Sequence, residues 1–191
     1  MTKVTAVKPG FDLDEWSPLA LEALETIRGG KGVLSLDEFE LLLSRAGRIP
    51  GPELLAEAWR LERIEVSTLA ATISDVWSDC EFPNLALDHD VWREMFRTAG
   101  YTRDGQRVER PQQSMELWRG APPQHSRGWS WTADRAMAER FAYGALRRRL
   151  PGRLYRVLAP PPALLCESSG RQESEFVVDT DGLEVEEVMP T

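Results

Sequence analysis

The stretch GRQESEFVVD, residues 170–179, carries two glutamates separated by one residue and followed by an apolar run. Residues two apart on a β-strand point to the same face of a sheet, so Glu173 and Glu175 would project side by side while Phe176 turns to the core. Two neighbouring carboxylates can act on one catalytic point. The same alternation is typical of a strand with one solvated face, and this stretch alone does not decide between the two.

Two upstream segments carry polar residues that could join the glutamates in a site. Arg119 lies in the β-like run LWRG, and Ser130 and Thr132 lie in the motif SWT, which precedes a helical segment. Each has an ordinary explanation when taken alone. An arginine on a strand usually forms a surface ion pair, and a Ser or Thr before a helix usually caps it. The informative feature is their order along the chain.

In that order the three segments resemble the arginine–serine–glutamate class of mono-ADP-ribosyltransferases, the branch that contains cholera-type and clostridial binary toxins. The resemblance covers about the last 80 residues. That class has an arginine ending a first strand, a Ser-x-Ser/Thr motif on a second strand and Glu-x-Glu on a later one. Its serine motif is followed by a helix with a phenylalanine near the end, here Phe141. Its Glu-x-Glu is followed by an apolar strand and an acidic turn, here FVVDTDG.

The resemblance implies an enzyme that uses NAD as co-substrate, needs no metal, releases nicotinamide and transfers ADP-ribose to a macromolecular acceptor. Glu175 would bond the ribose 2′-hydroxyl and stabilise the oxocarbenium-like cation that forms when the nicotinamide–ribose bond breaks. Glu173 would orient and help deprotonate the acceptor. In the family a glutamate at this first position goes with arginine acceptors, which favours protein arginine here.

The resemblance also implies a set of NAD-binding residues. Arg119 would clamp the phosphate–ribose region with its planar fork of donors, and the backbone of Gly120 would let the dinucleotide approach closely. Ser130 would hold the catalytic glutamate, and Thr132 would brace the loop and cap the following helix. Phe141 would stack on the nicotinamide or else pack in the core.

The sequence departs from the family pattern in a few places. Trp131 replaces a small residue in the middle of the serine motif and could narrow or reshape the pocket. Trp118 stands where the family often has tyrosine. The loop CESSGRQ carries no aromatic residue of the kind that toxins use to recognise targets, and Glu167 within it is interpreted as a loop residue rather than a third partner.

Two alternatives stay open. A NAD glycohydrolase would use the same residues with water as acceptor. A non-catalytic interaction protein would keep the fold in order to bind a partner.

Several other chemistries are excluded by what the sequence lacks. It has no Gly-x-Gly-x-x-Gly after a strand, no Walker A loop and no Gly-x-Ser-x-Gly elbow. His89 and His125 are the only histidines and have no ligand partners at metal spacing, so a zinc site is not expected. The net charge of -8 argues against nucleic acid and anionic membranes as partners, because cationic surface drives phosphate binding. The arginine cluster in RRRLPGRLYR is a local exception.

The first half of the chain is expected to be helical. Apolar residues recur at helical spacing within residues 12–32, 35–47, 51–64, 67–80 and 88–101. Ser35 and Glu38 form a capping-box pattern, Pro52 suits a helix start, and Gly100 suits a helix end.

The second half is expected to be built from short strands. β-like runs occupy residues 115–121, 152–160, 163–168, 174–180 and 183–188. One helix, within residues 132–144, interrupts them, with Thr132 as N-cap and with Ala133, Met137 and Phe141 on its apolar face.

Helices followed mainly by strands indicate an α+β fold, with a helical N-terminal half packed on a mostly antiparallel split β-sheet of ADP-ribosyltransferase type. We expect a helical segment at residues 1–50 and an ADP-ribosyltransferase-like domain at 51–191, with helices at 51–100 and a β-rich NAD-binding core at 112–191. The chain shows no signal peptide and no membrane-spanning run, and Cys80 and Cys166 are expected as buried free thiols. These features predict a soluble, cytoplasmic protein, and delivery to another cell stays open.

Overall fold

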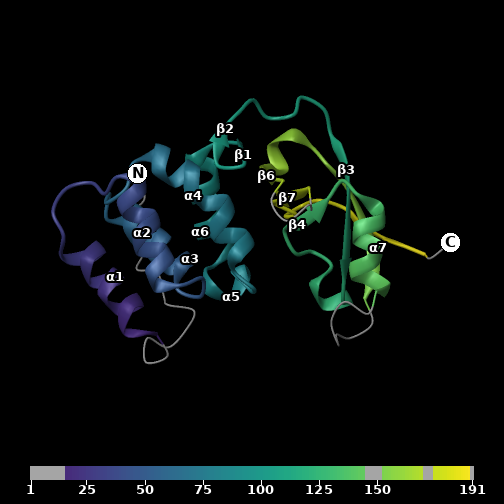
Figure 1. The fold of residues 1–191 in the computed structure, drawn as a ribbon. Coiled ribbons are helices and arrows are strands. Elements are labelled where there is room, and N and C mark those ends of the chain that lie inside the picture. Colours follow the sequence, from purple (N-terminus) through teal and green to yellow (C-terminus); the bar gives the residue numbers. More distant parts are fainter. Residues whose placement is uncertain (1–15, 145–151, 170–173, 190–191) are drawn as a thin grey trace. The chain divides into compact units, whose positions relative to one another are not determined.

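Figure 1 shows the fold of the computed structural model, which describes residues 16–144, 152–169 and 174–189. The predicted α+β class is confirmed, with helices first and mainly strands afterwards. The helices are α1 (Pro18–Gly29), α2 (Leu36–Ala46), α3 (Gly51–Arg60), α4 (Val66–Asp79), α5 (Pro83–Ala86), α6 (His89–Ala99) and α7 (Arg135–Tyr143). The strands are β1 (Thr102–Arg103), β2 (Gln106–Arg107), β3 (Met115–Ala121), β4 (Ser130–Thr132), β5 (Arg153–Ala159), β6 (Leu164–Ser168), β7 (Glu175–Val178) and β8 (Val185–Val188).

The chain divides into two compact units near residue 100, whereas the sequence favoured a boundary at residue 50. One unit comprises Met1–Gly100 with Gly105–Arg107, and the other comprises Tyr101–Asp104 with Val108–Thr191. The helices within residues 51–100 therefore belong with the N-terminal helices. The physical reason is packing, because α3 contacts both α1 and α4 through buried apolar side chains.

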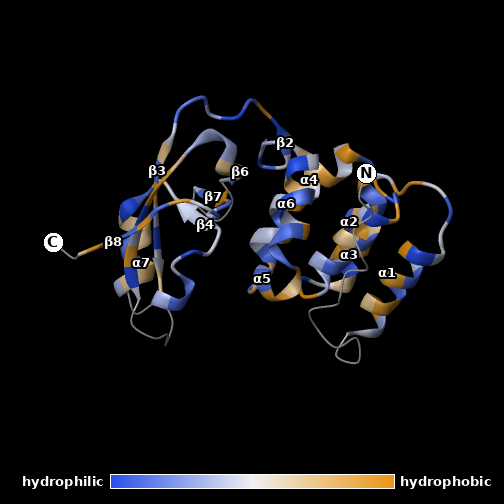
Figure 2. Ribbon diagram, turned by 180° about the vertical axis from the view of Figure 1, so that it is seen from behind, coloured by the Kyte–Doolittle hydropathy of each residue, from blue (hydrophilic) through white to orange (hydrophobic). Residues whose placement is uncertain are grey.

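The helices of the first unit start and pack where their sequences predict. Ser35 and Glu38 form the expected capping box, in which the Ser35 backbone N–H donates to Glu38 Oε2 at 2.8 Å. In α4 the stripe Leu69, Ile73 and Trp77 is buried, as its spacing predicts. Figure 2 shows apolar residues alternating with hydrophilic ones along these helices. None of the helices that the structure describes is both long and apolar enough to cross a lipid bilayer.

Aromatic packing joins α4 to α6. The ring of Trp77 meets Trp92 edge-on, with centroids 5.0 Å apart, and Phe96 lies 5.9 Å from the Trp77 ring. The indole N–H of Trp92 donates to the carbonyl of Pro83 at 3.0 Å, which satisfies the polar end of a buried ring. The tryptophans of these helices therefore serve the core.

Glu53, in the first turn of α3, is a buried carboxylate with 5% of the residue exposed. Neither of its oxygens accepts a hydrogen bond from another residue. Burial raises the pKa of Glu53 to about 7, and its own backbone N–H opposes this effect only in part. The folded helical unit therefore keeps this proton at pH values at which the unfolded chain has released it.

We expect the free energy of unfolding to fall as pH rises from about 4.5 to about 7, and then to level off. The contribution of protonated Glu53 is complete below the unfolded pKa and lost above the folded one, a difference of up to about 3 kcal/mol. Urea denaturation of wild type and Glu53→Gln between pH 4.5 and 8 measures it, and the variant should lack this component of the pH dependence. Glu40→Gln, at an exposed position on α2, is the matched control. Identical pH profiles for wild type and Glu53→Gln would contradict the expectation.

The strands form one sheet in the order β2-β1-β6-β7-β4-β3-β5-β8, where the sequence led us to expect a split sheet. The β1–β6 pair is parallel, and the pairs β6–β7, β7–β4, β4–β3, β3–β5 and β5–β8 are antiparallel. The sheet is therefore mixed and mostly antiparallel. The β3–β5 ladder runs the full length of β3, whereas the β3–β4 ladder is limited to the pair Trp118–Thr132.

The two faces of β3 meet different apolar clusters. Leu117 and Ala121 belong to the main core of the sheet, whereas Trp118 packs with the cluster that includes Ala138 and Ala142 of α7. The buried side of α7 is therefore the Ala138–Ala142 stripe, and the predicted apolar face through Ala133, Met137 and Phe141 is wrong. Small residues are needed there because the helix lies close against the strand.

The N-cap of α7 is Asp134, and the prediction of Thr132 in that role is wrong. The Asp134 carboxylate accepts hydrogen bonds from the backbone N–H groups of Ala136 and Met137 at 2.9 and 3.2 Å. Thr132 lies two residues earlier, and its hydroxyl oxygen accepts from the Asp134 backbone N–H at 3.0 Å. Thr132 therefore braces the turn into the helix without capping it.

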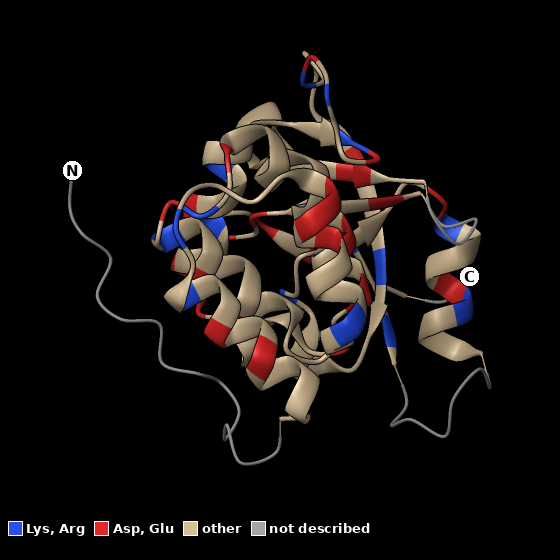
Figure 3. Ribbon diagram, turned by 60° about the vertical axis from the view of Figure 1, so that its left-hand side comes forward, with Lys and Arg blue, Asp and Glu red and all other residues tan. Residues whose placement is uncertain are grey.

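Acidic and basic residues are interspersed along the ribbon (Figure 3). Of the predicted arginine cluster, residues 147–149 lie outside the described residues. Arg153 forms an ion pair with Glu187, and Arg156 with Glu186 and Glu116, all on neighbouring strands. These arginines neutralise acidic neighbours, so this part of the cluster is no free cationic patch.

Candidate active site

Residues from all three predicted motifs lie on three adjacent strands, β3, β4 and β7. Across the sheet, Trp118 pairs with Thr132, and Thr132 pairs with Glu175. Paired residues of antiparallel strands project on the same face, so Thr132 and Glu175 stand side by side. Ser130 shares this face two residues further along β4, where its register partner is Val177. The tertiary fold thus brings β7 beside β4, although Thr132 and Glu175 are 43 residues apart in the sequence.

Arg119 is half-buried beside the first residue of β4. Its Nε donates to the carbonyl of His125 at 3.0 Å, and its Nη1 donates to the carbonyl of Ser130. A Cβ at Gly128 would overlap the guanidinium, so a larger residue there would require the Arg119 side chain to shift. The arginine therefore holds the connection between β3 and β4 in place, in addition to any contact with a ligand.

The charge of Arg119 is coupled to that of Glu175. Burial lowers the pKa of Arg119 to about 10, and the negative charge of Glu175 partly opposes this shift. The guanidinium thus stays charged at neutral pH. By strand alternation Arg119 leaves β3 on the face of Leu117 and Ala121, opposite to that of Glu175. Its Nη1 binds the carbonyl of Ser130, at the opposite end of β4 from Thr132, the register partner of Glu175.

Trp131 does not line the face that carries Glu175. Its ring is buried in the main core with Phe176, its register partner, and its indole N–H donates to the carbonyl of Gly128 at 2.7 Å. Because Ser130 and Thr132 alternate with it, they project on the other face. The expectation that Trp131 reshapes a pocket is therefore wrong. The bulky residue is accommodated by the core.

Gly120 packs against the backbone of α7. A Cβ at this position would lie under 3.0 Å from the Ala138 carbonyl oxygen and the Ala142 backbone nitrogen. Helix packing thus gives a complete reason for a glycine, separate from the predicted approach of a dinucleotide. Phe141, in the last turn of α7, has 49% of its surface exposed. This exposure excludes the core role for Phe141 and leaves its ring accessible to a ligand.

Of the two other glutamates considered with Glu175 in the sequence, the structure describes one. Glu173 lies outside the described residues. Glu167 is part of β6, so its interpretation as a loop residue is wrong. Its carboxylate accepts hydrogen bonds from Tyr101 Oη at 3.3 Å and Arg103 Nε at 2.8 Å. Burial, together with the charge of Glu167, raises the pKa of Tyr101. The Glu167 carboxylate is thus already hydrogen-bonded to Arg103 of β1 and to Tyr101, which precedes that strand.

Sequence reasoning missed the residues that support the Glu175 end of β7. Ser168, the last residue of β6, is the register partner of Glu175 on the side away from β4. Asp104, in the turn after β1, binds Ser169 through its carboxylate. The Asp104–Gly105 dipeptide is a recognisable turn signal, but its partner 65 residues away could not be read from it.

The structure offers no alternative built around a metal within the residues it describes. In that part of the chain, no group of three or more His, Cys, Asp or Glu residues is placed to hold an ion. Cys166 is buried as expected, whereas Cys80 is half-buried, and the two form no disulfide.

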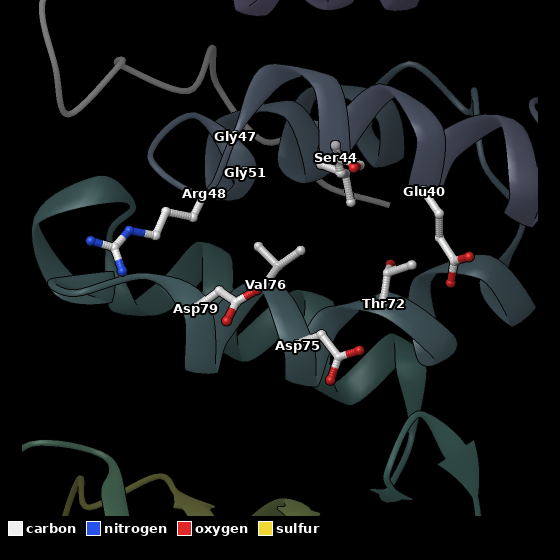
Figure 4. A pocket seen from close by; sticks show the side chains of 10 residues that line it. Glu40, Ser44, Gly47, Arg48, Gly51, Thr72, Asp75, Val76 and Asp79 are labelled. Atoms are coloured by element: carbon white, nitrogen blue, oxygen red, sulfur yellow. The ribbon is translucent and has the colours of Figure 1, made fainter. Parts of the chain in front are cut away.

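A separate pocket of about 390 Å³ lies in the helical unit (Figure 4). It is lined by α2, the start of α3 and α4, with Val76 and Leu43 among its apolar lining. Arg48 stands at one end, and Asp75 and Asp79, one helical turn apart on α4, form one wall. Among the residues that the structure describes, none from the three predicted motifs lines this pocket.

No family model, curated protein or solved structure matches this chain.

Proposed function

We propose that this protein is a NAD-dependent mono-ADP-ribosyltransferase that modifies a macromolecular acceptor, with protein arginine favoured. One observation carries the proposal: Glu175 stands beside Thr132 and on the same face as Ser130, and the half-buried guanidinium of Arg119 binds the Ser130 carbonyl and interacts with the charge of Glu175. The resemblance of the ordered motifs to the arginine–serine–glutamate class names the reaction that such an arrangement would perform.

The chemistry follows from the charges. Loss of nicotinamide leaves positive charge on the ribose C1, and an ionised carboxylate stabilises that charge more in the transition state than in the bound substrate. Glu175 supplies such a carboxylate. Arg119, which leaves β3 on the opposite face of the sheet, supplies a positive charge that would attract the anionic diphosphate of NAD. Phe141, exposed on α7, offers an aromatic surface for a flat ring.

Incubation of the purified protein with adenylate-labelled NAD and a cell lysate tests the proposal. We expect release of nicotinamide together with transfer of label to protein, and mass spectrometry should locate the label on arginine. Glu173→Gln should abolish transfer to arginine while sparing some hydrolysis of NAD, because the first glutamate prepares the acceptor rather than the ribose.

Two other results would assign a different function. Nicotinamide release without labelled protein, unchanged in Glu173→Gln, would indicate a NAD glycohydrolase. If folded protein neither binds NAD in calorimetry nor releases nicotinamide, the proposal fails and a non-catalytic binding role replaces it.

A further inference from the structure

The turn after β1 is hydrogen-bonded to the end of β6. The Asp104 carboxylate accepts two hydrogen bonds from Ser169, one from its backbone N–H at 2.7 Å and one from its hydroxyl at 2.8 Å. The Asp104 backbone N–H donates to the carbonyl of Glu167 at 3.0 Å. Asp104 thus binds the residues immediately before and after Ser168.

The backbone of the turn that makes these hydrogen bonds has little conformational freedom. Asp104 and Gly105 are the two residues between β1 and β2, and both have positive φ, +49° and +74°. Such two-residue turns favour Asn, Asp and Gly, which tolerate the left-handed region. The bonds from Ser169 lower the pKa of Asp104. It is therefore ionised at neutral pH, which strengthens both bonds.

The residue held between these contacts is the register partner of Glu175. Ser168 is the last residue of β6 and Glu175 the first residue of β7, so their pair closes the end of that ladder. Thr132, the partner of Glu175 on the other side, is likewise the last residue of β4. Ends of strands open more easily than their middles. Glu175 thus sits where both of its ladders are most prone to open.

The alignment of β7 near Glu175 is set by its two neighbouring strands. On the β6 side a register shift lies between Leu164 and Cys166, so the pairs from Cys166 to Ser168 define the alignment there. On the β4 side the three pairs from Thr132–Glu175 to Ser130–Val177 define it. A slip of one residue would turn the Glu175 side chain to the opposite face of the sheet.

We propose that Asp104 is a positioning residue for Glu175: its hold on Ser169 and Glu167 keeps the Ser168–Glu175 pair closed and in register, which aims the Glu175 carboxylate. The inference rests on the proposed function of Glu175. Asp104 itself does not act on the substrate. A displacement of a catalytic group by about 1 Å can lower a rate by about 100-fold.

Two graded substitutions test this role without straining the turn. Asp104→Gly accepts positive φ and removes both acceptor oxygens, and Asp104→Asn keeps one of them. The quantity to measure is kcat for nicotinamide release relative to the concentration of NAD-binding sites. This kcat should fall about 10- to 100-fold in the glycine variant and less in the asparagine variant. KM for NAD should stay within about twofold, because the NAD-binding residues are untouched. Asp90→Asn, at a side chain 92% exposed on α6, is the matched control and should leave kcat unchanged.

Hydrogen exchange provides a readout that does not depend on catalysis. In Asp104→Gly the amides of residues 175–178 should lose protection first at the Glu175 end, while the amides of β3 and β5 keep theirs. If wild-type protein releases no nicotinamide, the proposed function fails, and the exchange experiment still decides whether Asp104 holds this strand end. Unchanged protection in β7, or an unchanged kcat in an active wild-type background, overturns the inference.

Discussion

Glu175→Gln is expected to lower the rate of nicotinamide release by about 1,000-fold, and Glu175→Ala at least as much, with transfer of ADP-ribose lost in parallel. The amide keeps the size and hydrogen-bonding reach of the carboxylate but not its charge. Loss of one preorganised electrostatic contact to a developing charge typically costs about 3–4 kcal/mol of transition-state stabilisation. The measurement is single-turnover release of nicotinamide by protein shown to be folded.

A control variant tests whether the loss of any negative charge from the sheet unit lowers the rate, or only the loss of the charge of Glu175. Glu186→Gln changes an exposed glutamate on β8, where an ion pair with Arg156 contributes little, and should leave the rate unchanged. Binding of NAD to Glu175→Gln should weaken far less than the rate falls, because the charge matters most in the transition state. Equal activity of Glu175→Gln and wild type would remove Glu175 from the mechanism, and with it the proposed function.

Gly120→Ala is expected to destabilise the sheet unit by about 3 kcal/mol or more, the upper part of the range for overpacked sites. The new methyl group would meet backbone atoms of Ala138, Phe141 and Ala142. Backbone atoms cannot relieve this overlap by changing rotamer, as a side chain can. Helix α7 would therefore have to move away from β3. Urea denaturation measures the loss, and hydrogen exchange should show α7 and β3 opening more readily.

Gly29→Ala is the matched control for this substitution. A Cβ at Gly29, the last residue of α1, would meet nothing within 4 Å. The change should be neutral or slightly stabilising, because alanine loses less backbone entropy than glycine in a helix. If Gly120→Ala were as stable as Gly29→Ala, the close approach of α7 to β3 would not be a feature of the protein in solution.

Local patterns predicted most of the elements. The capping box at Ser35, the apolar stripe of α4 and the alternation in β3 each depend on neighbours within a few residues, so a single sequence reveals them. Errors arose where two local explanations compete. Thr132 and Asp134 both suit an N-cap, and only the actual first turn of α7 selects Asp134. The apolar face of α7 was misjudged because small residues, Ala138 and Ala142, mark the closest contact.

The sequence by itself determined which residues could form the site and in what order, because side-chain chemistry and strand alternation are local properties. It could not determine how those residues are supported, since hydrogen-bond partners distant in the chain meet only after folding. The tertiary structure alone decided that Thr132 faces Glu175, that Trp131 turns into the core, and that Arg119 binds backbone carbonyls. It also brought Asp104 to Ser169, across 65 residues, at the strand end where Glu175 begins. The register of paired strands is set by long-range packing and turn geometry, which no short stretch of sequence contains.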